Sequence, residues 1–254
     1  MQKRMLIRAD DLGYSRGTNY GIADTVWNGI VRTVGLMPNM EEAEHGVELL
    51  KGSGICLGQH TNLCFGKPVA SPEKIPSLLD ENGFLKSSRE YRKAWHEGYE
   101  IAKLDELVIE IEAQYHRFLE LTGMKPQYFE AHAIAGKNLS LALRTVADRY
   151  ALPLLDGLPE KNPILFRGTD LHIILKSSQP GYNPLKCLQE AAMKNYPGSG
   201  CAMFITHPAY LDNALMDSTS LTIPRIKETA MLTDPETRKW LTDSHISLIT
   251  YNDL

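Results

Sequence analysis

The alternation of two apolar patterns along the chain constrains its fold more than any other feature. Short apolar runs suited to β-strands alternate with longer stretches in which apolar residues recur every three to four positions, as on one helix face. Such alternation predicts an α/β protein with a mostly parallel sheet. For a chain of 254 residues, we expect a single domain over 1–254 that forms a closed or distorted (β/α) barrel of about seven or eight, mostly parallel strands.

The clearest element is a helix predicted over 104–122, because its apolar side chains form one stripe and Gly123 follows as a stop. The segment 64–103 has weaker periodicity and several prolines, and we interpret it as an insertion that serves as a lid, a binding loop or an interface. The predicted strands are 5–7, 31–37, 55–63, 128–132, 152–155, 171–175, 201–206 and 246–251, and further helices are expected at 22–30, 43–50, 89–99, 139–150, 184–195 and 235–242.

Composition excludes several classes of function. The net charge is −4 and no basic stripe is present, so nucleic acid is not an expected partner. No apolar run approaches the roughly 18 residues that span a bilayer, and no signal peptide is recognisable, so a membrane is not expected either. The four cysteines form no CxxC pair, which is typical of reduced, buried thiols in a cytoplasmic protein.

Carboxylates and imidazoles follow four of the predicted strands. A single strand-end aspartate is often a helix cap, and a single histidine is often a packing residue. In a parallel α/β sheet, however, the carboxyl ends of the strands meet on one face, so four such groups together indicate one site. The groups are Asp10 with Asp11, His60 with Asn62, Glu130 with His132, and His207.

These residue types favour a site for a divalent metal. Two imidazoles and one carboxylate can hold such an ion and leave positions open for water and substrate. The adjacent Asp10 and Asp11 could divide two tasks, one binding the metal and one acting as a general base. Consecutive strand side chains point in opposite directions, so this division requires a turn, for which Gly13 is suited. The other histidines are interpreted as structural or exposed: His45, His96, His116, His172 and His245.

Several motifs, in order, resemble the YdjC-like carbohydrate deacetylases, the family that contains the chitooligosaccharide deacetylases. The resemblance covers nearly the whole chain. The similar segments are Arg8-Ala9-Asp10-Asp11-Leu12-Gly13, Leu36-Met37-Pro38-Asn39, Gly58-Gln59-His60-Thr61-Asn62-Leu63, Gly66-Lys67-Pro68-Val69, Thr206-His207-Pro208-Ala209-Tyr210, and Arg225 with Glu228, Leu232 and Asp234-Pro235.

The resemblance implies a distorted barrel similar to the polysaccharide deacetylases. It also implies a metal held by Asp11, His60 and His132, with magnesium as the first expectation and zinc as the second. Asp10 would be the general base, and His207 would protonate the leaving amine or stabilise the oxyanion. Arg225 would orient a catalytic carboxylate, contact substrate or form a plain salt bridge. A homodimer is a further implication.

One segment departs from the family pattern. The family usually has "D-x-H-x-H-x-H" where this chain has Glu130, His132, Ile134 and Gly136 in the four defined positions. The proposed metal ligands remain, but two imidazoles expected near the substrate are replaced. The longer Glu130 side chain is a candidate hydrogen-bond partner of a metal ligand.

The leading hypothesis is a hydrolase of linear amide bonds that removes N-acetyl groups from acetylated mono- or oligosaccharides. Two alternatives stay open. One is a different metal-dependent sugar enzyme, such as an isomerase or a phosphoester hydrolase, because fold alone does not fix chemistry. The other is a sugar-binding protein that has lost catalysis. This alternative is suggested by Ile134 and Gly136, which stand where the family pattern has histidines.

Overall fold

The computed structural model describes residues 3–156 and 162–254, and it divides into two compact units. Of the described residues, unit 1 contains 3–35, 41–57 and 162–254, and unit 2 contains 36–40 and 58–156. The chain passes from one unit to the other within β2 (Thr33–Leu36) and β3 (Cys56–Thr61).

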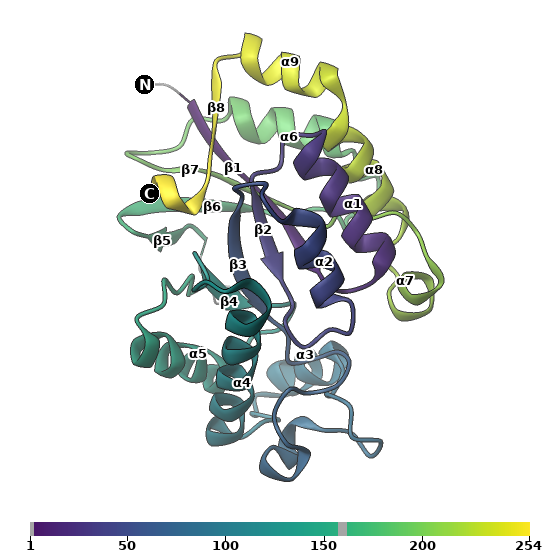
Figure 1. Cartoon of the computed structure of the whole chain (residues 1–254). Coiled ribbons are helices and arrows are strands. Elements are labelled where there is room, and N and C mark those ends of the chain that lie inside the picture. The colour runs from purple at the N-terminus through teal and green to yellow at the C-terminus, as the bar shows by residue number, and fades with distance from the viewer. Residues whose placement is uncertain (1–2, 157–161) are drawn as a thin grey trace. The chain divides into compact units, whose positions relative to one another are not determined.

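Unit 1 is built on a mostly parallel sheet around the buried strand β1 (Figure 1). Strand β1 pairs in parallel with β7 and β8, and β7 pairs in parallel with β6, whereas β5 is antiparallel to β6. The register sets Ala9 opposite Thr206, so Asp10 and His207 follow at the same end of neighbouring strands. The strands are β1 (Lys3–Leu12), β5 (Ile164–Phe166), β6 (Thr169–Ile174), β7 (Cys201–Thr206) and β8 (Ile246–Ile249).

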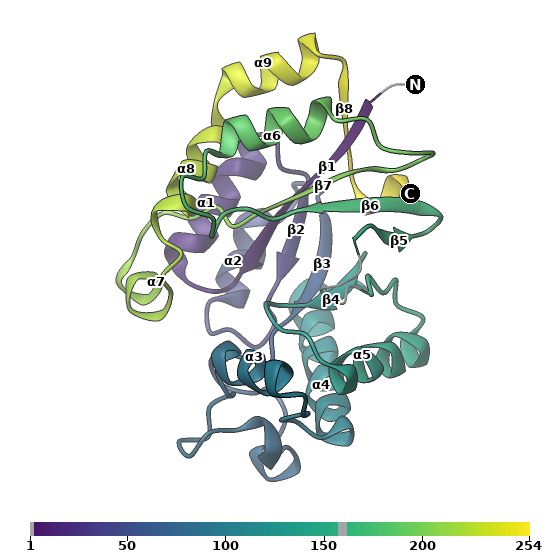
Figure 2. The same cartoon turned by 180° about the vertical axis from the view of Figure 1, so that it is seen from behind.

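Six helices of unit 1 accompany this sheet, and Figure 2 shows them from behind. Helix α1 begins at Arg16, six residues earlier than the helix expected at 22–30, because the Ser15 side chain caps it by accepting a hydrogen bond from Thr18 N. The absence of a side chain at Gly21 allows the backbone of Ala209 to pack against α1, since a Cβ there would lie 2.4 Å from Ala209 Cα. The helices are α1 (Arg16–Trp27), α2 (Ala43–Leu50), α6 (Pro184–Met193), α7 (Asn213–Ser218), α8 (Ile223–Thr233) and α9 (Pro235–Asp243), and a 3₁₀ turn, η3 (Tyr251–Asp253), follows β8.

Unit 2 joins the end of β3 to a short parallel strand, with His60 opposite Glu130 in the register. Helix α4 has the predicted bounds and ends at Gly123, which is left-handed with φ 69°. Its apolar stripe packs into a core that includes Leu107, Ile111 and Tyr115. The elements are η1 (Pro72–Lys74), η2 (Pro76–Leu78), α3 (Ser88–Glu97), α4 (Leu104–Thr122), β4 (Phe129–Ala131) and α5 (Lys137–Tyr150).

Two carboxylates of helix α4 accept hydrogen bonds from backbone N–H groups of the segment 64–103. Buried Glu110 accepts a 2.8 Å hydrogen bond from Ala70 N, and Glu106 accepts one of 2.5 Å from Ser77 N. These bonds satisfy backbone groups that the weakly periodic segment leaves outside any helix or strand. That the segment is an insertion into one domain over 1–254 stays a prediction.

The predicted α/β class with a mostly parallel sheet is confirmed. Three details of the prediction were wrong. The strand expected over 152–155 is only an isolated bridge between Leu154 and Phe129, because the chain has just left α5 through the left-handed Ala151. Strand β5, which was not predicted, is antiparallel, and helices α7 and α8 were also not predicted.

The four cysteines of the sequence are all buried and free, as expected: Cys56, Cys64, Cys187 and Cys201. Within residues 3–156 and 162–254, no helix combines the length and the apolar character that a membrane crossing needs.

Candidate active site

The Asp10-Asp11 pair in unit 1 lies where β1 turns. Asp11 itself is left-handed, with φ 75°, and Tyr14 N donates a 3.0 Å hydrogen bond to its carbonyl. Aspartate is among the few residues that tolerate this conformation. The required turn therefore begins at Asp11, two residues before the predicted Gly13, and it frees the two side chains from strict strand alternation.

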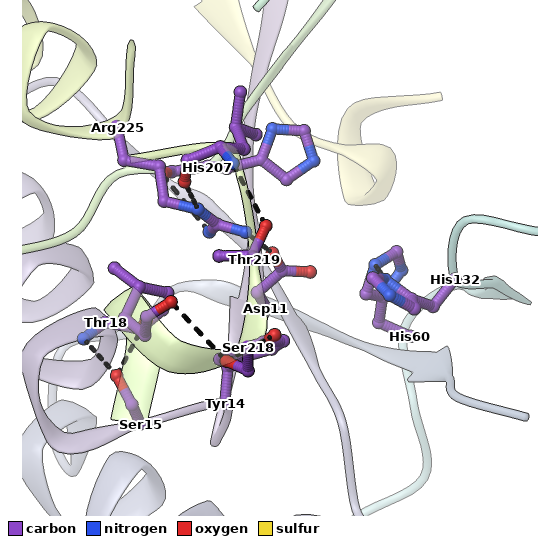
Figure 3. A network of polar contacts seen from close by, with 12 residues as sticks. Asp11, Tyr14, Ser15, Thr18, His60, His132, His207, Ser218, Thr219 and Arg225 are labelled. Atoms are coloured by element: carbon purple, nitrogen blue, oxygen red, sulfur yellow. Dashed lines mark hydrogen bonds and ion pairs between the residues drawn. The ribbon is translucent and has the colours of Figure 1, made fainter. Parts of the chain in front are cut away.

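Each carboxylate of the Asp10-Asp11 pair forms a salt bridge with a different arginine. Asp10 Oδ2 lies 2.6 Å from Arg8 Nη2. Asp11 Oδ2 lies 2.7 Å from Arg225 Nη2, and Figure 3 shows these two residues. All four side chains are at most 4% exposed. Removing one partner of such a buried pair leaves a charge without compensation, so each arginine fixes its carboxylate strongly. Arg225 thus forms a salt bridge with Asp11, the aspartate that the family resemblance expects to bind the metal.

Helix α8 also holds the backbone of His207. Glu228, three residues after Arg225, accepts a 2.7 Å hydrogen bond from His207 N through Oε2 and a 2.8 Å bond from the Tyr182 hydroxyl through Oε1. Residues three apart share a helix face, which is why α8 can present both side chains together. The sequence pattern contained Glu228 but gave it no role.

Burial raises the pKa of Glu228 to about 7 from its ordinary value of 4.5, against the lowering effect of its hydrogen bonds. The folded state therefore holds the proton more tightly than the unfolded state, so this contribution to stability is full below pH 4.5 and is lost as the pH rises toward 7. In the wild type, this group should make the free energy of unfolding fall by up to about 3 kcal/mol as the pH rises toward 7. We expect that fall to be absent in Glu228→Gln. Urea unfolding of both proteins at pH 5 and pH 8 checks this, and parallel pH profiles would contradict it.

The histidines of unit 2 form a second group. His60, near the end of β3, directs Nδ1 to a short hydrogen bond with Glu130 Oε1, and its Nε2 lies 2.9 Å from His132 Nδ1. The two rings meet edge to face with centroids 4.8 Å apart (Figure 3). The backbone of His132 is fixed in turn by a 2.9 Å bond from its N–H to Thr61 O.

His60 Nε2 and His132 Nδ1 lie 2.9 Å apart, which is the distance of a hydrogen bond between the two rings. Imidazole nitrogens are common metal ligands, and two this close together could bind one ion. Glu130 accepts the Nδ1–H of His60, which would leave the lone pair on Nε2 available to a metal. The residues present in unit 2 therefore fit a metal.

Ile134 and Gly136, the two residues expected to depart from the pattern of the similar family, lie in the loop after His132. Ile134 is buried in the core of unit 2, and Gly136 lies against Glu100, whose Oε2 would be 3.1 Å from a Cβ at that position. The Glu100 carboxylate accepts hydrogen bonds from Lys137 N at 2.9 Å and Asn138 N at 3.3 Å, at the start of α5. A carboxylate thus caps α5 beside the position where the family has an imidazole.

Replacing Glu100 with alanine is expected to lower the free energy of unfolding by about 1 kcal/mol, because the first turn of α5 loses the acceptor of two backbone N–H groups. Urea unfolding measures the change. Glu97→Ala is the matched control, since Glu97 makes only a surface ion pair with Lys93. Equal effects of the two substitutions would contradict the capping role.

The structure thus groups the predicted residues within each unit. Unit 1 brings together Asp10, Asp11, His207 and Arg225, and unit 2 brings together His60 and His132 with Glu130. Tyr182 was not predicted to take part, and Arg8 and Glu228 were part of the quoted motifs but were given no role. Of these, only the spacing between Arg225 and Glu228 carried a signal. Three of the remaining histidines have partners away from these groups: His45 contacts Asn19, His116 contacts Tyr150, and His172 contacts Tyr196.

A mostly parallel sheet with carboxylates and imidazoles at its strand ends defines an α/β protein with a candidate hydrolytic metal site. The family model described as "YdjC-like protein" matches residues 4–243, and the chain belongs to this family. It is 31% identical to a chitooligosaccharide deacetylase of Yersinia pestis (92% of each chain covered) and 29% identical to carbohydrate deacetylase 2 of Listeria innocua (99% and 98% covered).

Among solved structures, the chain is similar to a candidate cellobiose-phosphate cleavage protein of Enterococcus faecalis, with a TM-score of 0.81 at 22% identity. The match covers 100% of this chain and 99% of the other. At this level of identity the likeness confirms the fold class.

Proposed function

We propose that this protein is a metal-dependent carbohydrate deacetylase that hydrolyses the N-acetyl groups of short acetylated sugars such as chitooligosaccharides. The observation that carries the proposal is the imidazole pair of His60 and His132, oriented by Glu130, in a chain whose strand β1 also ends in two arginine-paired aspartates. Membership of the YdjC-like family and the names of its deacetylase relatives support the same chemistry.

The proposed metal ligands are Asp11, His60 and His132. Arg225 contacts Oδ2 of Asp11 and would hold this carboxylate in place for the metal. A divalent ion, when bound, polarises the acetyl carbonyl and makes water more acidic. Magnesium is the first candidate and zinc the second, although two imidazoles also suit other transition metals.

The remaining residues move protons and hold the site in shape. Asp10 accepts the proton of the attacking water, and His207 donates a proton to the leaving amine or stabilises the oxyanion. The amide C–N bond breaks, and acetate and a free amine leave. Arg225 positions Asp11 through their 2.7 Å contact, and Glu228 positions the backbone of His207.

A binding protein without turnover is the second candidate, because the loop at Ile134 and Gly136 presents no imidazole. Another metal-dependent sugar enzyme on the same fold is the third. Both predict metal binding, but neither predicts the release of acetate from an acetylated sugar.

Acetate release from N,N′-diacetylchitobiose tests the proposal. Metal-stripped protein would be reconstituted with magnesium, zinc or other divalent ions, beside Asp10→Asn, His60→Ala and the exposed control His116→Ala. We expect release that requires metal, disappears in the first two variants and persists in the control. Metal binding without release from a broad panel of acetylated sugars would favour the alternatives.

A cytoplasmic location and a homodimer complete the proposal. Four buried free thiols are typical of a reducing compartment and support the first. The family resemblance supports the second, and light scattering on the purified protein tests it, with a monomeric mass as the contrary result.

A further inference from the structure

A line of hydrogen bonds in unit 1 runs from Asp10 to the end of the chain. Arg8 Nη2 binds Asp10 Oδ2 at 2.6 Å, and Arg8 Nη1 donates to the Tyr251 hydroxyl at 3.2 Å. Arg8 and Tyr251 are 243 residues apart in the sequence. Arg8 is 3% exposed and Tyr251 is 0% exposed, so water cannot readily take the place of either contact.

Tyr251 is itself fixed from several sides. It opens the 3₁₀ turn η3, in which Thr250 caps the turn and the Asp253 carboxylate accepts Thr250 N at 2.7 Å. Its carbonyl accepts a 3.2 Å bond from Arg167 Nη1, and its ring packs edge to face on Phe166 with centroids 5.1 Å apart. The tyrosine hydroxyl is therefore a rigid anchor for the arginine that touches it.

The two aspartates have separate supports. Asp11 is held by Arg225, which reaches it from α8 and donates through Nε to Leu221 O at 2.9 Å. Asp10 is held by Arg8, which comes from β1 and is held by the C-terminal turn. Because the two contacts involve different arginines, each can be removed by its own substitution.

We propose that Arg8 and Tyr251 are positioning residues for the general base: Tyr251 holds Arg8, and Arg8 holds the carboxylate of Asp10. The inference rests on the proposed function for the role of Asp10. Its physical reason is that a proton acceptor must lie within hydrogen-bond reach of the attacking water, and a displacement of about 1 Å can cost about 100-fold in rate. The C-terminal turn η3 thereby becomes part of the support of the active site.

Two measurements, turnover of the sugar and binding of the metal without sugar, distinguish the positioning role of Arg8 and Tyr251 from an effect on overall stability. We expect Tyr251→Phe to lower kcat for acetate release by about 10-fold and Arg8→Ala to lower it by about 100-fold. The KM and the metal affinity, measured by calorimetry, should stay unchanged in both variants. Tyr115→Phe, which also removes a buried tyrosine hydroxyl, is the matched control.

Two further measurements test whether Tyr251 acts through Arg8 and whether Arg8 acts through its guanidinium group. In the Arg8→Ala background, Tyr251→Phe should have no additional effect on kcat, because the tyrosine acts through the arginine. Added guanidinium should restore part of the lost kcat of Arg8→Ala, without effect on the wild type, and urea at the same concentration should not. Should Arg8→Ala fail to fold, Arg8→Lys and Tyr251→Phe carry the test.

The inference is overturned if Arg8→Ala keeps the wild-type kcat, if the two substitutions act additively, or if metal affinity falls in parallel with kcat. Absence of turnover in the wild type with every metal and sugar would contradict the proposed function instead. In that case a crystal structure of the Arg8→Ala protein decides the positioning role by itself. A displaced Asp10 carboxylate supports the role, and an unmoved one overturns it.

Discussion

Replacing Asp10 with asparagine is expected to lower kcat for acetate release by about 1,000-fold, because the amide keeps the shape of the carboxylate but cannot accept the proton of water. Metal affinity should stay near the wild-type value, since the proposed ligand is the neighbouring Asp11. Steady-state assays with the reconstituted protein, together with calorimetric titration of the metal, measure both quantities.

Two controls make this result specific. Asp148→Asn makes the same chemical change at an exposed position of α5 and should leave kcat unchanged. Asp11→Asn should lose metal affinity first. If Asp10→Asn lost the metal and Asp11→Asn lost only turnover, the two roles would have to be exchanged. Thermal unfolding of each variant shows how much of an effect comes from breaking the buried pair with Arg8.

Replacing His60 with alanine is expected to lower metal affinity by more than about 100-fold, because changes to groups that merely orient a ligand already cost about 10–100-fold. Acetate release should disappear with it. Glu130→Gln should fall between this variant and the wild type, since the amide can keep a hydrogen bond to His60 Nδ1 but loses the charge that favours its Nδ1–H tautomer. Calorimetric titration with magnesium and with zinc measures the series.

The exposed His116 of unit 2 provides the control, and His116→Ala should bind metal as the wild type does. A wild-type affinity in His60→Ala would remove His60 from the proposed ligand set. An equal loss in Glu130→Gln and His60→Ala would instead indicate that Glu130 itself binds the ion, which would revise the ligands but not the location of the site.

Ile134 and Gly136, which differ from the expected family pattern, each have a definite structural setting in this chain. Ile134 adds to the core of unit 2, and Gly136 leaves room for the Glu100 carboxylate at the start of α5. We expect these replacements to bear on the range of sugars rather than on metal binding, because neither residue belongs to the proposed ligand set. Comparing acetate release across sugars of different length addresses this point.

Features that depend on neighbouring residues were determined by the sequence itself. The stripe of apolar side chains and the stop at Gly123 predicted the bounds of α4. The apolar run over 201–206 likewise matched β7. Periodicity and capping act within a few residues, so they are visible before any tertiary contact forms.

Only the tertiary structure decided which charged groups support the candidate site. Arg225 and Asp11 are 214 residues apart, and Arg8 and Tyr251 are 243 apart, so no local pattern could pair them. The left-handed turn at Asp11 and the isolated bridge at Leu154 also depend on packing around them. The sequence by itself thus determined most of the helices and strands and the chemical types at their ends, but not β5, α7 or α8. Burial and long-range contacts determined which arginine serves which aspartate, because a buried charge is stabilised by whichever opposite charge the fold brings to it.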